Sequence, residues 1–456
     1  MAAAAVGGAC AAAYASGGAA TATHRPNLPK VHIRPDHRGF VARGGRPFTP
    51  CGCAYFRPNT GWAPQIWKKF DVAATRRDLL LLKAHHFNVV RLFLASNAFY
   101  PKPGALNGAS VDKLDQFLDS AAAAGIYVQI CGLDRWEGTP KWQLADAFTQ
   151  EDALAARTEF WAALAARYRG NNAIFAYELG NEPAVAWNTP GMRTAWNQWR
   201  HAPTPIPAAA DKPGDPTLLA FQNFRERLAE RWTRQPVATI KKADPAALVT
   251  VGLIQWSVPA VANPVNLYSG FRPAKIAKYL DFMEIHFYPL ADGIYTYQSD
   301  AVRIANLAYL ESVMREMDST GRAVVLAEFG WYGGGALPNA GNRPPATQQQ
   351  QATFCSQEVN ITEPLACGWL NWAMYDTPAA QDVTRFSGLF QSDGKIKTWG
   401  RQFAALVADF HKNPPAPHKV GPRPALPWDA CLTSSKAAAK FQKEYLHAFR
   451  REMQRT

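Results

Sequence analysis

Residues 173–183 read Ala-Ile-Phe-Ala-Tyr-Glu-Leu-Gly-Asn-Glu-Pro, an apolar and aromatic run that ends in an amide, a carboxylate and a proline. The run has the length and composition of a buried strand, and Pro183 stops it. A parallel α/β barrel presents its functional groups in this way, at the carboxyl ends of its strands. The stretch therefore predicts a barrel strand that delivers Asn181 and Glu182 to a site.

The same arrangement recurs at residues 323–330, where an apolar run ends in Glu328, Phe329 and Gly330. Two glutamates at the ends of two strands form a candidate carboxylate pair, which is the pair that glycoside hydrolysis uses. Strands that are far apart in the sequence can face each other across a barrel mouth, so the two carboxylates can lie close together. The pair therefore predicts cleavage of glycosidic bonds.

Eight β-like runs alternate with helical segments along the body of the chain. The runs lie at residues 50–57, 87–94, 125–133, 173–183, 247–252, 279–289, 323–330 and 367–375. Amphipathic patterns between them, as at 71–86 and 151–168, predict helices. The alternation predicts an α/β fold, a (β/α)8 TIM barrel. The alternative is a doubly wound sheet, but the sequence lacks the glycine-rich phosphate turn expected after one of its early strands.

The two ends of the chain differ from this body in composition. Residues 1–22 are almost entirely Ala and Gly, which indicates a candidate signal segment, with a disordered leader as the alternative. Residues 23–46 form a basic arm, 47–411 the expected catalytic barrel, and 412–456 a Pro-rich linker with a basic C-terminal helix. We therefore expect a secreted or periplasmic protein. No later run is long and apolar enough to span a membrane, so stable membrane insertion is not expected.

The excess of basic residues behind the net charge of +13 is concentrated in residues 24–46 and 411–456. The body between them is nearly neutral, which disfavours a nucleic-acid partner. The 7 cysteines lack zinc-site spacing, so neither a metal nor a cofactor is expected. Most of the thiols are expected to be buried and free, and a bridge from Cys355 to Cys367 or Cys431 stays open. The oligomeric state is not indicated.

Five motifs in order along the chain carry a resemblance to a known family. They are Arg91, Leu-Gly-Asn-Glu-Pro at 179–183, His-Phe-Tyr at 286–288, Ala-Glu-Phe-Gly at 327–330 and Trp372. With them the chain resembles glycoside hydrolase family 5, the cellulase and mannanase type in the clan of retaining barrel glycosidases, over about residues 45–410. The resemblance implies a metal-independent retaining β-glycosidase whose carbohydrate substrate is β-linked glucan, mannan or a related oligosaccharide.

The resemblance also implies a role for individual residues. Glu182 would be the general acid/base and Glu328 the nucleophile. Arg91 would stabilise the Glu328 carboxylate, and Asn181 would hydrogen-bond the sugar.

Further residues are expected to bind substrate. His286 would lie near the reacting sugar, Tyr288 would lie against the nucleophile, and Trp372 would form a platform under the ring. Trp136 and Trp256 are also expected at the substrate. Many family members carry a histidine at the end of the third strand, where this chain has Asp-Arg-Trp-Glu at 134–137. That departure leaves the sugar undetermined.

Two further groups of residues have an expected place in the barrel. Glu178 and Glu284 lie on the same strand faces as Glu182 and His286 but deeper, so they are expected to be ion-pair partners inside the barrel. The long segment 184–216 holds Trp187, Trp196 and Trp199, which we expect to form a wall of the substrate cleft.

Three alternative functions were weighed against this hypothesis. An exo-acting β-mannosidase or β-glucosidase type of enzyme would use the same residues, so it stays open. A non-catalytic carbohydrate-binding barrel commonly lacks one carboxylate, whereas this chain has both. A metal-dependent barrel hydrolase would need several His and Asp residues at strand ends, and only His286 is so placed.

Overall fold

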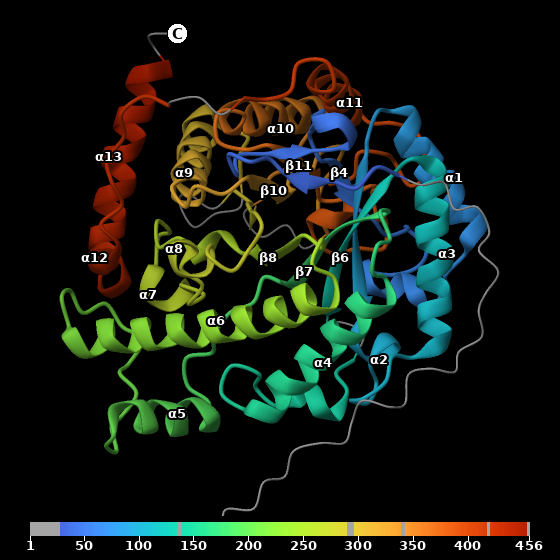
Figure 1. Ribbon diagram of the computed structural model, residues 1–456. Coiled ribbons are helices and arrows are strands. Elements are labelled where there is room, and N and C mark those ends of the chain that lie inside the picture. Colours follow the sequence, from blue (N-terminus) through green and yellow to red (C-terminus); the bar gives the residue numbers. More distant parts are fainter. Residues whose placement is uncertain (1–27, 135–137, 290–295, 339–342, 417–419, 454–456) are drawn as a thin grey trace, which may run out of the picture.

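Eight parallel strands close into a barrel at the centre of the computed structural model, and helices surround it (Figure 1). The structure describes residues 28–134, 138–289, 296–338, 343–416 and 420–453. The strands follow one another around the barrel in chain order, and β11 closes the ring by pairing with β4. They are β4 (Cys51–Ala54), β5 (Val89–Ala95), β6 (Tyr127–Asp134), β7 (Ile174–Asn181), β8 (Val249–Leu253), β9 (Met283–His286), β10 (Val324–Phe329) and β11 (Gly368–Asn371). The TIM-barrel prediction is confirmed.

Helices cross over between successive strands and form the outer layer. The longer ones are α1 (Val72–Ala84), α3 (Gly108–Ala124), α4 (Glu151–Arg167), α5 (Pro190–Arg200), α6 (Pro216–Ala243), α9 (Asp300–Asp318), α10 (Gln348–Thr362), α11 (Thr398–Phe410) and α13 (Ser435–Met453). Short helices are α2 (Ser96–Phe99), α7 (Pro264–Leu267), α8 (Pro273–Ile276) and α12 (Trp428–Thr433).

Local sequence signals explain where these helices begin and end. At the start of α3, the Asn107 side chain accepts a hydrogen bond from the Ser110 N–H. The helix ends at Gly125, whose φ of 73° lies in the left-handed region that glycine adopts without strain. At the start of α10, Thr347 and Gln350 each bond the other's backbone N–H, which is a capping box.

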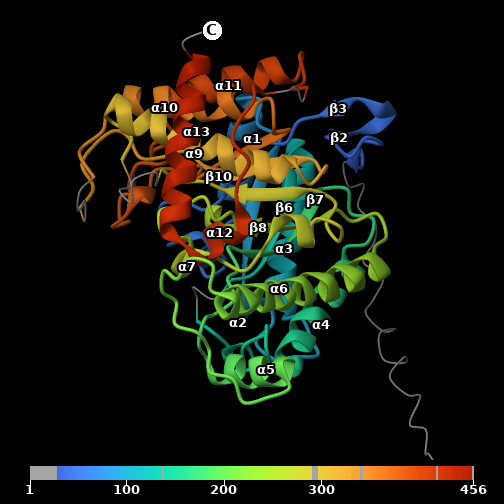
Figure 2. The ribbon, with the colours of Figure 1, turned by 90° about the vertical axis from the view of Figure 1, so that its left-hand side faces the viewer.

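The basic arm contributes a small antiparallel sheet that was not predicted from the sequence. Its strands are β1 (His32–Ile33), β2 (Phe40–Val41) and β3 (Pro47–Phe48), and they lie at the edge of the molecule (Figure 2). The rings of Phe40 and Phe48 pack against aromatic rings at the amino ends of the barrel strands, including Phe175. The arm therefore covers the end of the barrel that is opposite to the strand ends carrying Glu182 and Glu328.

The C-terminal helix α13 packs along α9, on the outside of the barrel (Figures 1 and 2). Phe441, Tyr445 and Phe449 are its buried aromatic residues. The basic C-terminal helix therefore packs on the outer helical layer of the barrel. Among the described residues, no helix combines the length and apolar character needed to cross a membrane.

The structure corrects the interpretation of residues 184–216 as a cleft wall. Much of the segment is α5, which lies on the side of α6 that faces away from the barrel (Figures 1 and 2). Trp196 is completely buried, and its ring packs against Phe221 and Phe224 of α6. Trp187 packs on Phe221, and Trp199 stacks on Trp196. The tryptophans attach α5 to α6 because α6 offers them an apolar surface.

The described cysteines, which are all except Cys10, are buried and form no disulfide bond. Cys355, Cys367 and Cys431 therefore form no bridge with one another. The prediction of buried thiols outside disulfide bonds holds for all six.

Candidate active site

Glu182 follows directly after β7, at the barrel mouth. Its backbone N–H donates to the carbonyl of Gly252 on β8 at 2.8 Å. Its φ of 48° lies in the left-handed region, which is uncommon for a residue other than glycine and is found at functional sites. The side chain is 26% exposed, so its carboxylate can be reached from solvent.

Glu328 lies near the end of β10 and accepts hydrogen bonds on both carboxylate oxygens. Arg91 donates to Oε1, and the Tyr288 hydroxyl donates to Oε2 at 2.7 Å. Burial and the neighbouring Glu328 carboxylate raise the pKa of Tyr288 well above its ordinary value, so the phenol keeps its proton and acts as a donor. The two donors stabilise a negative charge on Glu328.

The two glutamates lie close together, although 145 positions separate them in the sequence. One carboxylate oxygen of Glu182, one of Glu328 and a ring nitrogen of His286 all lie within 4.8 Å of one another. Retaining glycosidases hold their two carboxyl groups about 5–5.5 Å apart, whereas inverting enzymes need about 6.5–9.5 Å to admit a water molecule. The two carboxylates of this pair thus approach each other more closely than the separation that inverting enzymes need.

Arg91 and Asn181 connect the pair to the barrel interior. The Arg91 guanidinium is completely buried, and its Nη2 donates to the Asn181 side-chain oxygen at 2.7 Å. Because that oxygen accepts from Arg91, the Asn181 amide group is oriented with its N–H donors directed elsewhere. Arg91 thus lies beside Glu328, as predicted from the sequence, and it also orients Asn181.

His286 lies between the two glutamates at the end of β9. Its Nδ1 is 3.1 Å from Glu182 Oε1 and 3.7 Å from Glu328 Oε2. The ring is completely buried. The imidazole therefore contacts the carboxylate pair from inside the barrel, on the side away from solvent.

Below this layer, Glu178 and Glu284 lie inside the barrel, as predicted. Arg91 donates to both oxygens of Glu178 at 2.6 Å, and its Nε is 3.6 Å from Glu284. The Gln129 amide nitrogen donates to both carboxylates at 2.9–3.0 Å. Because these donors occupy the carboxylate oxygens, the group functions as a hydrogen-bonded charge network rather than as a set of free metal ligands.

Trp372 comes directly after β11 and belongs to an aromatic cluster at the mouth. Its ring packs against Phe56, Trp62 and Phe93, and its Nε1 donates to Thr384 at 3.2 Å. The Arg91 guanidinium lies 4.5 Å from the centre of the Phe93 ring. Trp372 is thus connected to the carboxylate pair through the Phe93 ring, on which it packs, and the Arg91 guanidinium, which lies over that ring.

Two other predicted residues are not joined to this site. Trp136 lies outside the described residues. Trp256 follows β8 in a short 3-10 turn, and its buried Nε1 has no hydrogen-bond partner among the described residues.

Sequence reasoning missed two supporting residues. The Gln255 side chain donates to the Tyr288 carbonyl at 3.0 Å and accepts from the Tyr288 N–H at 2.7 Å, so it fixes the backbone that carries the phenol. A β-carbon at Gly252 would lie 2.2 Å from Glu178 Oε1 and 3.0 Å from His286 Nε2. Glycine at this position therefore leaves the space that both side chains occupy. In the sequence, this close approach could have been inferred from the glycine at the end of an apolar run.

A pocket of about 370 Å³ adjoins the site and is lined by Asn181 and Glu182. Phe148 and Trp232 line it with stacked rings, and Gln143 faces it from the loop after β6. The Gln143 side-chain oxygen is buried and has no hydrogen-bond partner among the described residues. Ligand pockets typically enclose about 300–1,000 Å³. The pocket is therefore large enough for a small ligand beside Glu182.

Comparison with known families gives one match that covers most of the chain. The model described as Cellulase (glycosyl hydrolase family 5) matches residues 45–377. No curated protein matches the chain.

Solved structures with the same fold include several carbohydrate-active proteins. A GH5_18 protein from Streptomyces cattleya, in complex with Manβ1-4GlcNAc, is 21% identical with a TM-score of 0.63, and the match covers 88% of this chain and 93% of that one. A GH5_18 protein from Bifidobacterium longum subsp. longum, also with Manβ1-4GlcNAc, is 20% identical with a TM-score of 0.58, at 82% and 81% coverage. The exo-β-1,4-mannosidase Op5Man5 from Opitutaceae bacterium strain TAV5 is 18% identical with a TM-score of 0.60. That match covers 84% of this chain and only 63% of the mannosidase.

Proposed function

The chain belongs to glycosyl hydrolase family 5 and is a retaining glycoside hydrolase, and we propose that it releases terminal β-linked mannosyl groups from short oligosaccharides. In this proposal Glu328 is the nucleophile and Glu182 is the general acid/base. The observation that carries the choice of this pair is the approach of one oxygen of each carboxylate to within 4.8 Å of the other.

In the first step Glu328 attacks the anomeric carbon of the sugar. The bond to the leaving oxygen breaks, and Glu182 gives its proton to that oxygen. The product is a covalent glycosyl ester on Glu328. Arg91 and Tyr288, which donate to Glu328, stabilise the ionised form that attacks.

In the second step Glu182 acts as a base and takes a proton from water. That water attacks the anomeric carbon from the face that the leaving group left, and the ester bond to Glu328 breaks. Two inversions give overall retention of configuration. The exposure of Glu182 at the mouth allows both the leaving group and the water to reach it.

The preference for short mannosides rests on two observations. Three solved structures of this fold are an exo-β-1,4-mannosidase and two GH5_18 proteins in complex with Manβ1-4GlcNAc. The pocket beside Glu182 has the volume of a small-ligand site, which suits a leaving group of one or two sugar units. A polymer-cleaving enzyme of the cellulase type is the second candidate, because the matching family model carries that description.

Product analysis on a substrate panel tests the proposal. The panel contains Manβ1-4GlcNAc, β-1,4-mannan, β-1,4-glucan and aryl β-mannoside, β-glucoside and β-galactoside. We expect kcat/KM to be highest on Manβ1-4GlcNAc and the aryl mannoside, with β-mannose as the first anomer detected by NMR. Faster cleavage of a polymer into oligosaccharides would refute the substrate proposal but not the catalytic roles. α-Mannose as the first product would refute the retaining roles of the two glutamates.

A further inference from the structure

Three carboxyl groups lie around a single guanidinium at the base of the barrel mouth. Glu178, Glu284 and Glu328 come from β7, β9 and β10, and the guanidinium is that of Arg91 on β5. Glu178, Glu284 and Arg91 are completely buried. One positive charge cannot offset several buried negative charges, so the cluster requires either another cation or bound protons.

Arg91 donates hydrogen bonds to two of these carboxylates. Glu178 receives two hydrogen bonds from it, and Glu328 receives one. Glu284 lies farther away, at 3.6 Å from Arg91 Nε, and its short contacts come from the neutral Gln129 amide. Glu284 is therefore the fully buried carboxylate of this cluster that lacks a short contact with a permanent cation.

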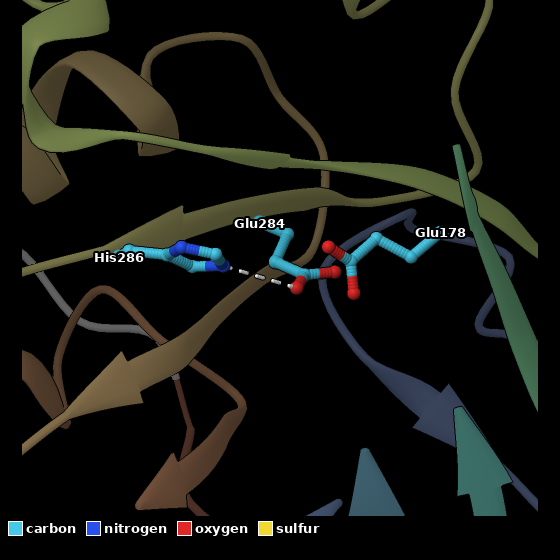
Figure 3. Close-up of side chains that lie close together, drawn as sticks. All are labelled: Glu178, Glu284 and His286. Atoms are coloured by element: carbon cyan, nitrogen blue, oxygen red, sulfur yellow. Dashed lines mark ion pairs between the residues drawn. The ribbon is translucent and has the colours of Figure 1, made fainter. Parts of the chain in front are cut away.

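The His286 imidazole also lies beside Glu284, and when protonated it adds a second positive charge at the same 3.6 Å distance as Arg91 Nε. Figure 3 shows Glu284 between the imidazole and Glu178, with the ion pair to His286 drawn as a dashed line. His286 Nε2 is 3.6 Å from Glu284 Oε1, and on the opposite side of the ring Nδ1 faces Glu182 and Glu328. The imidazole thus connects the buried carboxylate with the pair at the mouth.

We propose that Glu284 is a positioning residue: it is the fully buried counter-charge that, together with the Glu328 and Glu182 carboxylates, keeps His286 protonated, so that the imidazolium can hold Glu182 and Glu328 in place. The inference rests on the roles of Glu182 and Glu328 proposed above. Glu284 itself touches no substrate, because it is completely buried below His286.

The titration of the two groups agrees with this geometry. Burial and the nearby Arg91 charge lower the pKa of His286, but the Glu328 carboxylate and the contacts of its ring N–H groups with the Glu182 and Glu284 carboxylates raise it overall to about 10. Burial and the nearby Glu178 charge raise the pKa of Glu284 to about 7. A carboxyl group is ionised above its pKa and an imidazole is charged below its own. Between about pH 7 and 10 the two therefore form a charged pair.

A metal ion is the other kind of cation that this cluster could hold. Ligand atoms of Glu178, Glu284 and His286 lie within 4.8 Å of one another, which is close enough for one ion. However, Arg91 and Gln129 already donate hydrogen bonds to the same carboxylate oxygens. A metal ion there would displace these donors and lie beside a guanidinium, so a proton on His286 is the better balance of charge.

The imidazolium is useful whenever Glu182 is ionised. In the free enzyme, two ionised carboxylates so close together repel each other, and a cation beside them reduces that repulsion. In the second step Glu182 has lost its proton and acts as a base, and the Nδ1–H of His286 stabilises its negative charge.

Glu284→Gln tests the proposal, because the amide keeps the shape of the side chain and removes its charge. We expect the His286 pKa to fall by roughly one to three units. It is measured on 15N-histidine-labelled protein, with the His286 signal assigned by comparison with His286→Gln. At pH 8 we expect kcat to fall about tenfold with KM almost unchanged, which corresponds to ~1.4 kcal/mol of lost transition-state stabilisation.

Two further variants make the result specific. Glu284→Asp keeps the charge, so the His286 pKa and kcat should lie between those of Glu284→Gln and the wild type. Glu358→Gln is the matched control: Glu358 is also fully buried, on α10, and burial raises its pKa well above the usual value, so an amide replaces a neutral carboxyl group. We expect it to leave His286 and kcat unchanged.

A wild-type His286 titration in Glu284→Gln would overturn the proposal, and so would a wild-type kcat or a change confined to KM. If Glu284→Gln does not fold, the Asp variant decides, because its His286 pKa must then lie below that of the wild type. The titration needs no substrate. The proposed function can therefore fail, with no β-glycoside cleaved, while the link from Glu284 to His286 is still measured.

Discussion

Tyr288 and Arg91 approach Glu328 from different strands and donate to different oxygens of its carboxylate. Each donor therefore contributes separately to the stability of the anion. The contact with Arg91 is buried and the contact with Tyr288 is half-buried, and a hydrogen bond to a charged group contributes about 1.5–3 kcal/mol. The roles at this site can accordingly be tested one side chain at a time.

Glu328→Ala should reduce hydrolysis by several orders of magnitude, because it removes the nucleophile. Added azide can enter the space and attack the anomeric carbon, so it should restore part of the activity and give a glycosyl azide of inverted configuration. The product is identified by NMR. If azide instead restored the activity of Glu182→Ala and gave an inverted glycosyl azide, Glu182 would be the nucleophile and Glu328 the acid/base.

Tyr288→Phe removes one donor to Glu328 and keeps the ring. We expect kcat to fall about 10- to 100-fold, given the strength of a hydrogen bond to a charged group. The matched control is Tyr127→Phe, because the Tyr127 hydroxyl also makes a 2.7 Å hydrogen bond, to the Pro29 carbonyl at the opposite end of the barrel. Steady-state kinetics on an aryl glycoside should show the loss for Tyr288 alone; equal losses would indicate a general effect of removing a hydroxyl.

Gly252→Ala should disturb the charge network from below. The added carbon would lie 2.2 Å from Glu178 Oε1, so Glu178 must move and Arg91 loses its bidentate partner. Overpacking of a buried site typically costs about 1–3 kcal/mol. We expect a lower melting temperature and lower kcat together. Gly108→Ala is the control, since no atom lies within 4 Å of its added carbon. A Gly252→Ala variant with the melting temperature and kcat of the wild type would contradict the packing around Gly252.

At the scale of single elements, α5 shows how an aromatic-rich segment can be structural. Its buried face meets α6, and the Trp187 indole N–H donates to the Pro207 carbonyl at 2.9 Å, which closes the segment on itself. An element held in this way contributes to stability through buried aromatic area.

Trp196→Ala should therefore destabilise the protein by about 3–5 kcal/mol, the usual cost of truncating a large buried side chain. Chemical denaturation gives the free energy of unfolding. The ratio of kcat/KM on an oligosaccharide to that on an aryl glycoside should stay unchanged. A selective loss on the oligosaccharide would restore the cleft-wall interpretation that the structure has replaced.

At the scale of the whole molecule, the barrel could be predicted because each of its strands is buried on both faces. Such strands are short apolar runs, and functional groups at their ends mark where they stop, as at Glu182 and Glu328. The convergence of Arg91, Tyr288 and Glu328 could be anticipated from the resemblance to a family, since its motifs recur at strand ends.

The rest depends on contacts that a linear pattern does not contain. Gln129 reaches both Glu178 and Glu284 only because the strands close into a ring with these side chains at one depth. The three tryptophans of 184–216 gave no indication of which surface they cover. The basic arm was read as polar, yet Phe40 and Phe48 are the residues that place it against the barrel.

Residues of the C-terminal extension bind to helix α9 in the outer layer of the barrel. Arg423 donates to both oxygens of Glu311 on α9 at 2.6 and 3.1 Å, and the Tyr445 hydroxyl donates to the same carboxylate at 2.8 Å. Phe441 packs next to Tyr445 on the buried face of α13 and is 4% exposed. Since α9 leads into β10, which carries Glu328, this extension supports the catalytic strand from outside.

Phe441→Ala should lower the free energy of unfolding by about 3–5 kcal/mol, because it leaves a cavity between α13 and α9. Below the melting transition kcat/KM should keep its wild-type value, since the carboxylate pair lies inside the barrel and α13 lies outside it. Lys440→Ala, whose side chain is 77% exposed, should change stability by no more than about 0.5 kcal/mol. Urea denaturation and kinetics on the same samples measure both quantities. Equal stability of the two variants would mean that α13 does not contribute to the folded barrel.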